Sequence, residues 1–208
     1  MDRDYSPPLK TRVSLLERLR DWQDQASWED FFDTYWKLIY STARKAGLSD
    51  EEAQDVVQET MVSVNRRIPT FHYDAARSFK GWLLKLTRWR IVDQFRERGP
   101  VHAHHGSGSG GGSATQLVAS IPDAATLVPN NVWEMDWQKN LAEVALARVR
   151  ARVDPQKYQL FDFYVNKEWP AEKVAERFRV STNQVYLAKH RLTALLKEEV
   201  QRLEKETI

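Results

Sequence analysis

The feature that most constrains the fold is a run of apolar residues at helical spacing between residues 49 and 98. Ser49, followed three residues later by Glu52, has the capping-box pattern that starts a helix. Ala53, Val56, Val57, Thr60, Met61 and Val64 then lie on one helical face, and Phe79, Trp82, Leu83, Leu86 and Val92 do so in the second half. Because no stretch alternates with the period of a strand, the sequence predicts an all-α fold.

The two halves of this run carry opposite charge. Residues 28–62 contain three basic and eight acidic side chains, whereas residues 77–98 contain seven basic and two acidic ones. The chain as a whole has a formal charge of only +2, so any affinity for nucleic acid must come from a local patch. The basic half also carries Trp89 off its apolar stripe, and Phe71, His72 and Tyr73 precede it. Cations for phosphates and rings for unpaired bases therefore occur together.

Three short motifs follow one another in this run: DVVQE at 55–59, FKGWL at 79–83 and DQFR at 93–96. In this order, with the capped helix and the aromatic loop, they resemble region 2 of the ECF (extracytoplasmic function) group of the sigma-70 family. Members of that family are RNA polymerase subunits that select bacterial promoters. The resemblance covers roughly residues 28–98. It departs from the family at Trp89, where the family often has Asn.

The resemblance assigns roles to individual residues. It implies that Asp55, Gln58 and Glu59 bind the polymerase, although for any one of them a solvated helix face is the simpler interpretation. It implies contacts to the downstream promoter element from a second, mostly basic and aromatic set. This set comprises Arg67, His72, Tyr73, Arg77, Lys80, Lys85, Arg88 and Trp89. Phe71 is as well placed to pack into the core as to meet a base.

Residues 169–192 have the spacing of a helix-turn-helix. Pro170 starts one short helix, Arg179 and Val180 form the turn, and Ser181 caps the next helix. The first exposed residues of such a second helix reach base edges, and later ones hold phosphates. The candidates for bases are Thr182, Asn183, Gln184 and Tyr186, and those for phosphates are Lys189, His190 and Arg191. A plain helical hairpin is the alternative, but the segment also resembles region 4 of the same family.

A linker is predicted between these two parts. Five of the eight glycines lie between Gly106 and Gly112, a composition that behaves as a flexible coil. Prolines in residues 117–130 favour an extended chain there. The sequence thus predicts a region-2-like domain at 1–98, a flexible linker at 99–130 and a region-4-like domain at 131–208, with few contacts between the domains.

The remaining helix boundaries follow from caps. Ser27 is predicted to start a helix with Phe31, Phe32 and Tyr35 buried, which Gly47 ends. A short helix is expected at 15–21, Asn131 is expected to open the second domain, and Asp154 with Pro155 to restart a helix.

Composition argues against most enzyme classes. The chain contains no cysteine, no glycine loop of phosphate-binding form and no metal-ligand spacing, and His102, His104 and His105 lie in the glycine-rich segment without carboxylate or thiolate neighbours. We therefore expect no cofactor, no bound metal and no enzymatic activity. No apolar run approaches a membrane span and the N-terminus lacks a signal peptide, so the sequence favours a cytoplasmic address.

The resemblance favours a sigma factor of ECF type that directs core RNA polymerase to promoters and opens promoter DNA. Its expected partners are the clamp and flap regions of the large polymerase subunits, promoter DNA and an anti-sigma factor. The alternative is a stand-alone helix-turn-helix regulator with a helical domain that senses a partner or ligand. That alternative does not explain why an acidic helix is paired with a basic, aromatic one outside the helix-turn-helix.

Overall fold

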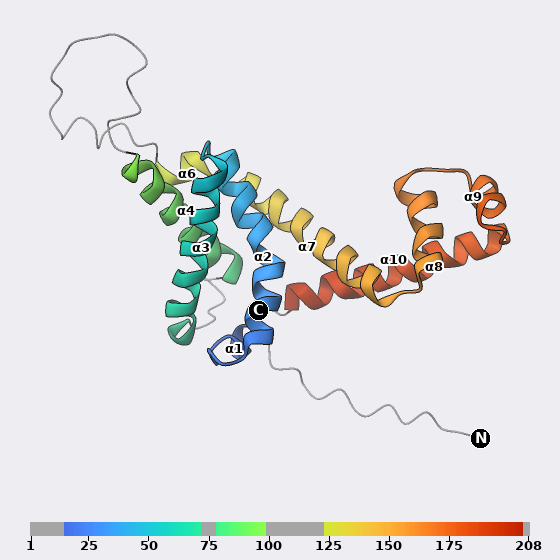
Figure 1. Ribbon diagram of the computed structural model, residues 1–208, viewed down its shortest axis with the longest axis horizontal. Coiled ribbons are helices and arrows are strands. Elements are labelled where there is room, and N and C mark those ends of the chain that lie inside the picture. The colour runs from blue at the N-terminus through green and yellow to red at the C-terminus, as the bar shows by residue number, and fades with distance from the viewer. Residues whose placement is uncertain (1–14, 72–77, 99–122, 206–208) are drawn as a thin grey trace, which may run out of the picture.

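The computed structural model describes residues 15–71, 78–98 and 123–205, and these residues form helices joined by short turns (Figure 1). The described residues contain no strand, so the all-α prediction is confirmed. In chain order the elements are α1 (Leu15–Arg18), α2 (Gln25–Lys45), α3 (Asp50–Arg67), the 3-10 turn η1 (Ile68–Thr70), α4 (Phe79–Glu97), α6 (Ala124–Leu127), α7 (Asn130–Arg152), α8 (Pro155–Phe161), the π-helical turn η3 (Asp162–Asn166), α9 (Ala171–Phe178) and α10 (Thr182–Lys205).

Local sequence signals set most helix ends. The capping box of α3 is present: the amide of Glu52 donates to Ser49 Oγ at 3.3 Å, and the amide of Ser49 donates to a Glu52 carboxylate oxygen at 2.6 Å. Gly47 has φ of +95°, a conformation that suits glycine, just after α2 ends. The predicted start of α2 at Ser27 is wrong. Asp24 caps the helix instead, because its carboxylate accepts from both the amide and the hydroxyl of Ser27.

Helices α2, α3 and α4 surround the main core, and α7 packs onto it. Trp137 of α7 stacks on Tyr35 of α2, with ring centroids 5.3 Å apart, and meets Phe79 of α4 edge-on at 6.4 Å. Trp133 and Leu141 of α7 are buried in the same cluster. The prediction of few contacts between the two domains is therefore wrong, because the apolar face of α7 finds its partner on α2 and α4.

The end of the predicted linker is also ordered. Residues 124–127 form α6, which packs against α4, whereas the prolines led us to expect an extended chain there. Asp123 precedes this turn, and Val128 behind it is buried in the main core. Residues 99–122, with the glycine-rich segment and its three histidines, lie outside the described residues.

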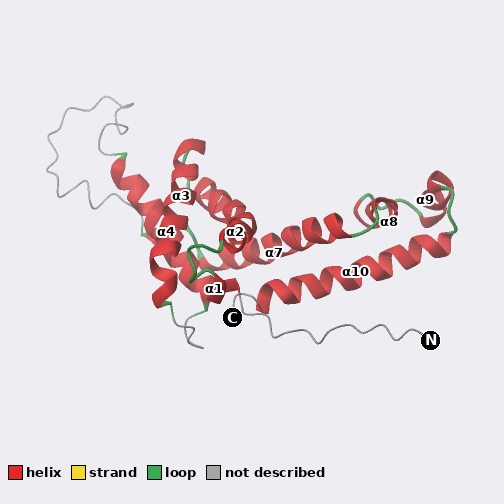
Figure 2. Ribbon diagram, turned by 60° about the horizontal axis from the view of Figure 1, so that its bottom comes forward, coloured by secondary structure: helices red, strands yellow, loops and turns green. Residues whose placement is uncertain are grey.

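Helices α7 and α10 run alongside each other and carry α8 and α9 away from the main core (Figures 1 and 2). A second, smaller cluster of buried residues holds this far end together. Its members are Leu160, Ala171, Val174, Ala175, Val185 and Ala188. No described helix combines the length and the apolar character needed to cross a lipid bilayer.

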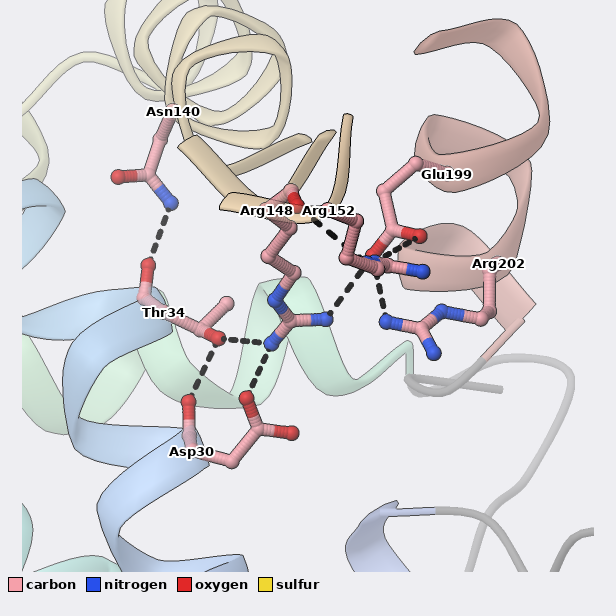
Figure 3. A network of polar contacts seen from close by, with 7 residues as sticks. All are labelled: Asp30, Thr34, Asn140, Arg148, Arg152, Glu199 and Arg202. Atoms are coloured by element: carbon pink, nitrogen blue, oxygen red, sulfur yellow. Dashed lines mark hydrogen bonds and ion pairs between the residues drawn. The ribbon is translucent and has the colours of Figure 1, made fainter. Parts of the chain in front are cut away.

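A polar network joins α7 and α10 to α2 (Figure 3). Glu199 of α10 is 5% exposed and accepts from Arg152 at 2.8 Å, from Arg148 at 3.4 Å and from Arg202. Arg148 also donates to Asp30 and, at 3.0 Å, to the hydroxyl of Thr34. The amide of Asn140 donates to the Thr34 carbonyl at 2.7 Å. Burial raises the pKa of Glu199, but the arginines outweigh it and hold that pKa below its usual value.

Candidate nucleic-acid interface

The outer face of α3 is acidic and exposed. Asp55, Gln58 and Glu59 all point away from the buried stripe, and Val62, which is 40% exposed, extends the face by one turn. The capping box at Ser49 fixes the helix start, so these side chains keep their places relative to the core. A carboxylate oxygen of Glu59 lies 3.6 Å from a guanidinium nitrogen of Arg90 on α4. The three predicted polymerase-binding residues therefore share one accessible surface.

Helix α4 is positioned by Phe79, Leu83 and Leu86, which are buried in the main core. Lys85 and Trp89 lie on its exposed side, and Arg67 at the end of α3 reaches the same place. The Lys85 ammonium and the Arg67 guanidinium each lie 4.9 Å from the centre of the Trp89 ring. This cluster combines an accessible ring with two cations, which is the chemistry that binds unpaired bases and their phosphates.

Two other predicted cations of α4 contact the α6–α7 segment. The Lys80 ammonium lies 2.5 Å from a carboxylate oxygen of Glu134, and this hydrogen bond lowers the pKa of Glu134. Arg88 donates from Nε to the carbonyl of Val128 at 3.1 Å and from Nη2 to Asn130 Oδ1 at 2.8 Å. Burial lowers the pKa of Arg88 below its usual value, while the nearby carboxylate of Asp123 opposes that shift. Sequence gave no sign of these contacts.

A cleft of about 580 Å³ opens beside Trp89, between the ends of α3 and α4. Arg90 lines it and donates to the hydroxyl of Ser63 at 3.1 and 2.8 Å. Arg96 lines it as well, 3.6 Å from a carboxylate oxygen of Asp93. Neither arginine was among the predicted site residues, although both lie in the basic run, and the position of Arg96 two helical turns after Trp89 was a usable signal.

At the far end of the molecule α9 is followed by a short turn and then by α10. Arg179 ends α9 with φ of +54°, which explains why a glycine suits this position. Ser181 starts α10: its hydroxyl accepts from the Gln184 amide at 3.3 Å, and its own amide donates to Gln184 Oε1 at 2.9 Å. This capping box was not anticipated, and it occupies the side-chain carbonyl of Gln184, one of the predicted base-reading groups.

The other predicted residues of α10 lie on more than one side of the helix: Tyr186 and Lys189 turn toward Tyr164, whereas Arg191 lines a cleft beside α8. Asn183, Tyr186, Lys189, His190 and Arg191 are exposed, and Thr182 is half-buried. Tyr186 meets Tyr164 of η3 edge-on, with ring centroids 5.7 Å apart, and the Lys189 ammonium lies 5.4 Å from the Tyr164 ring. Tyr164, which the sequence did not single out, thus orients two of the candidate DNA-binding side chains.

The loop between α3 and α4 is described only at its start. Phe71 turns inward, with its ring centroid 4.8 Å from that of Trp82 and 6.2 Å from that of Phe79. The alternative in which Phe71 packs into the core is therefore correct. His72, Tyr73 and Arg77 lie outside the described residues. The structure does not join the predicted residues into one site: the α3–α4 surface and the α10 face lie at opposite ends of the molecule (Figure 1).

Comparison with known proteins supports one of the two resemblances. Residues 31–100 match the family model of sigma-70 region 2. Over 102 residues the chain is 24% identical to the ECF RNA polymerase sigma factor SigE of Mycolicibacterium smegmatis, an alignment that covers 48% of this chain and 38% of that protein. The chain thus matches well under half of this relative's length. Together these findings support a region 2 domain of the sigma-70 kind at residues 31–100, whereas the resemblance of α9–α10 to region 4 stays a prediction.

Proposed function

We propose that this protein is a sigma factor of ECF type that brings core RNA polymerase to promoters and helps to open them. The observation that carries the proposal is the division of charge within the region 2 match: the outer face of α3 is acidic, and α4 beside it presents cations and an accessible tryptophan. A protein that binds polymerase and DNA at once requires two unlike surfaces of this kind. A cytoplasmic location follows from that role.

In this proposal Asp55, Gln58 and Glu59 bind the clamp of the polymerase. Asp55→Arg should abolish co-purification with core polymerase and leave the fold intact, because Asp55 is exposed and off the buried stripe. Glu143→Arg is a matched control, since Glu143 is an equally exposed carboxylate on α7, away from α3. Undiminished binding by Asp55→Arg contradicts the assignment.

The downstream promoter element meets α4 and the loop before it. Arg67, Lys85 and Trp89 supply accessible groups for a separated strand, and we assign base capture to His72 and Tyr73 on the strength of the region 2 resemblance. Replacing His72 and Tyr73 by Ala should leave polymerase binding unchanged but reduce open-complex formation, measured by permanganate reactivity of unpaired thymines. A premelted bubble should restore the lost activity. Full opening of linear duplex by this double variant would move base capture to α4.

The upstream promoter element meets α10 in this proposal, and the same end of the molecule binds the polymerase flap. Asn183, Gln184 and Tyr186 face solvent where a recognition helix carries its base-reading residues. The test that separates this role from a stand-alone regulator is transcription from a genomic DNA library by core polymerase with and without the protein. Specific starts only in its presence support a sigma factor. Tight, specific binding to duplex without polymerase would favour the regulator.

A further inference from the structure

Tyr164 lies in η3, between α8 and α9, but its ring contacts two side chains of α10. The Tyr186 ring meets it edge-on at an interplanar angle of 82°, with ring centroids 5.7 Å apart. The Lys189 ammonium lies 5.4 Å from the centre of the same Tyr164 ring. Because Tyr186 and Lys189 are three positions apart on α10, they are neighbours on its surface, and one ring reaches both.

Both α10 side chains remain accessible despite this contact. Tyr186 is 47% exposed and Lys189 is exposed as well, whereas Tyr164 is half-buried. The ring of Tyr164 therefore supports the two side chains and leaves them free to contact a ligand. In the proposed function Tyr186 contacts a base and Lys189 contacts a phosphate.

The backbone of η3 determines where Tyr164 points. The Lys167 amide donates to the Asp162 carbonyl at 2.9 Å, five residues back, so η3 contains one residue more than an α-helical turn. The extra residue shifts the directions of the side chains in the turn relative to those of a continuous α-helix. Glu168 follows with φ of +54°, which is uncommon for a residue with a side chain. Turns of this kind occur frequently at functional sites.

Phe163, next to Tyr164, anchors the turn from the inside. Its ring meets those of Trp169 and Phe178 edge-on, with ring centroids 4.8 and 5.3 Å away. The amide of Trp169 donates to the Phe163 carbonyl at 3.0 Å, and the Lys167 ammonium lies 3.7 Å from the centre of the Phe163 ring. These contacts hold the backbone around Tyr164, so its ring has a fixed position from which to contact α10.

Holding Tyr186 and Lys189 in place before DNA arrives favours binding. A lysine side chain loses rotamer freedom when it binds a phosphate, and a ring that already restricts the side chain reduces the part of this loss that falls on binding. The face of an aromatic ring attracts the ammonium group, and edge-to-face packing restricts the Tyr186 ring. Tyr164 can thus affect DNA binding without touching DNA.

We propose that Tyr164 is a positioning residue of the α10 surface, whose ring holds the Tyr186 ring and the Lys189 ammonium where they contact DNA. The inference rests on the proposed role of α10 in binding the upstream promoter element. The effect belongs to the ring and not to the hydroxyl, because the ring makes both contacts. Loss of the ring therefore weakens base selection at Tyr186 and phosphate binding at Lys189 together.

Two substitutions separate the ring from the rest of the side chain. Tyr164→Phe keeps the ring, whereas Tyr164→Leu keeps an apolar side chain without a ring. Tyr158→Leu is the matched control: Tyr158 is also a half-buried tyrosine with a cation over its ring, Arg150 at 5.2 Å, but it lies on α8. Polymerase that carries each variant of the full chain is bound to a library of promoters with a randomised upstream element, over a range of salt concentrations.

We expect Tyr164→Leu to bind about three- to tenfold more weakly than the parent, since an edge-to-face ring pair and an exposed cation–π contact are each worth about tenfold or less. The slope of log affinity against log salt should fall by up to about 0.9, the contribution of one phosphate on duplex DNA. Base preference should weaken at the position where Tyr186→Ala weakens it. Tyr164→Phe and Tyr158→Leu should match the parent in slope and in preference.

The salt slope distinguishes positioning from a loss of stability. A smaller folded fraction, measured by thermal melts at the same salt concentrations, lowers the apparent affinity without removing a phosphate contact. In the Lys189→Ala background, Tyr164→Leu should reduce the slope no further, because both substitutions then act on the same contact.

Three results would overturn the proposal. If Tyr164→Leu behaves like Tyr158→Leu, the ring only packs within the turn. If Tyr164→Phe loses as much as Tyr164→Leu, the hydroxyl contacts DNA directly. If the slope changes of Tyr164→Leu and Lys189→Ala add, Tyr164 does not act through Lys189. Failure of the proposed function looks different, because the parent itself would then show no preference in the upstream element, and the role of Tyr164 would fall with it.

Discussion

The two helices proposed to meet DNA, α4 and α10, present their side chains in opposite ways. On α4, Lys80 and Arg88 contact the α6–α7 segment. On α10, Asn183 and Lys189 face solvent, and their neighbours within the same domain do not cover them. Both helices are basic and amphipathic in sequence. The difference teaches that a helix's own pattern fixes which face is polar, whereas the packing of distant elements decides whether that face is accessible.

The two ends also differ in how firmly they are held. Helix α4 is part of the main core with α2, α3 and α7, whereas α9 and the start of α10 rest on the small cluster around Val174 and Val185. Stability in a folded chain varies with local burial, so we expect the helix-turn-helix end to open at lower free energy than α4. Each prediction below can break or sharpen this contrast.

The largest expected effect is at Trp137, which links α7 to the main core. Trp137 is 4% exposed and contacts both Tyr35 and Phe79. Trp137→Ala should lower the free energy of unfolding by about 3–5 kcal/mol, because a large buried ring leaves a cavity. Urea denaturation followed by circular dichroism measures this. Trp22→Ala, at a tryptophan that is 73% exposed, should change it by less than about 0.5 kcal/mol. Equal effects would mean that α7 does not share the core.

The next effect concerns the charged network between α10, α7 and α2. Glu199→Ala should cost about 3 kcal/mol, because it removes the buried carboxylate that Arg148, Arg152 and Arg202 share. Since the folded-state pKa of Glu199 is below its ordinary value, its contribution is present in full above the unfolded pKa and is lost as the pH falls through the folded one. The difference between parent and variant should thus shrink in acid. Glu198→Ala, at the exposed neighbouring glutamate, is the control and should change the free energy of unfolding at neutral pH by less than about 0.5 kcal/mol.

On α10, substitutions of residues that contact bases and of residues that contact phosphates should have different effects on DNA binding. Asn183→Ala should change the preferred base at one position by about 1–3 kcal/mol, whereas Lys189→Ala should weaken all sequences alike and reduce the salt slope by about 0.9. Binding of polymerase carrying each variant to a promoter library measures both effects. Gln184 is a poorer probe, because its substitution also removes the side-chain oxygen that accepts from the Ser181 amide at the start of α10. Identical profiles for Asn183→Ala and Lys189→Ala would contradict the groove assignment.

Sequence predicted the helices well because their signals are local. The capping box at Ser49, the positive φ at Gly47 and the restart at Asp154 each depend on a few neighbouring residues. A helix start was harder to predict where two nearby residues could each act as the cap. Ser27 has the pattern of an N-cap, but Asp24 precedes it and caps the helix. Phe32 was predicted to be buried and is 43% exposed, since it lies at the edge of the stripe, where it stacks on Trp36.

The sequence predicted which kinds of residue form the candidate interface, but not which of them contact other parts of the chain. Exposure of Asp55 and Glu59 followed from helical period, because it depends only on which face the core takes. The contacts of Lys80 with Glu134 and of Arg88 with Asn130 join residues more than 40 positions apart, and periodicity carries no information on such pairs. The same limit explains the mistaken expectation of few contacts between the two parts of the chain: the apolar stripe on α7 indicated burial but not which helices it packs against.

The smallest predicted effect tests whether Arg98, the residue that follows α4, is also held by contacts within the protein. Arg98 pairs with Glu52 of the α3 capping box and donates to the Gly47 carbonyl at 3.2 Å. The hydrogen bond from Arg98 lowers the pKa of Glu52 from 4.5 to about 2. Glu52→Gln should therefore cost about 1 kcal/mol at neutral pH, measured by urea denaturation.

That cost should depend on pH in a defined direction. A carboxylate with a depressed folded pKa contributes fully above its unfolded pKa of about 4.5 and loses its contribution as the pH falls toward 2, so parent and Glu52→Gln should converge across that window. Glu51→Gln is the matched control, because it removes the same charge from the first turn of α3 at an exposed position. An equal change of stability with pH in both variants would mean that the helix dipole alone stabilises the Glu52 carboxylate. Arg98 would then be accessible to a phosphate, unlike Lys80 and Arg88, which contact the α6–α7 segment.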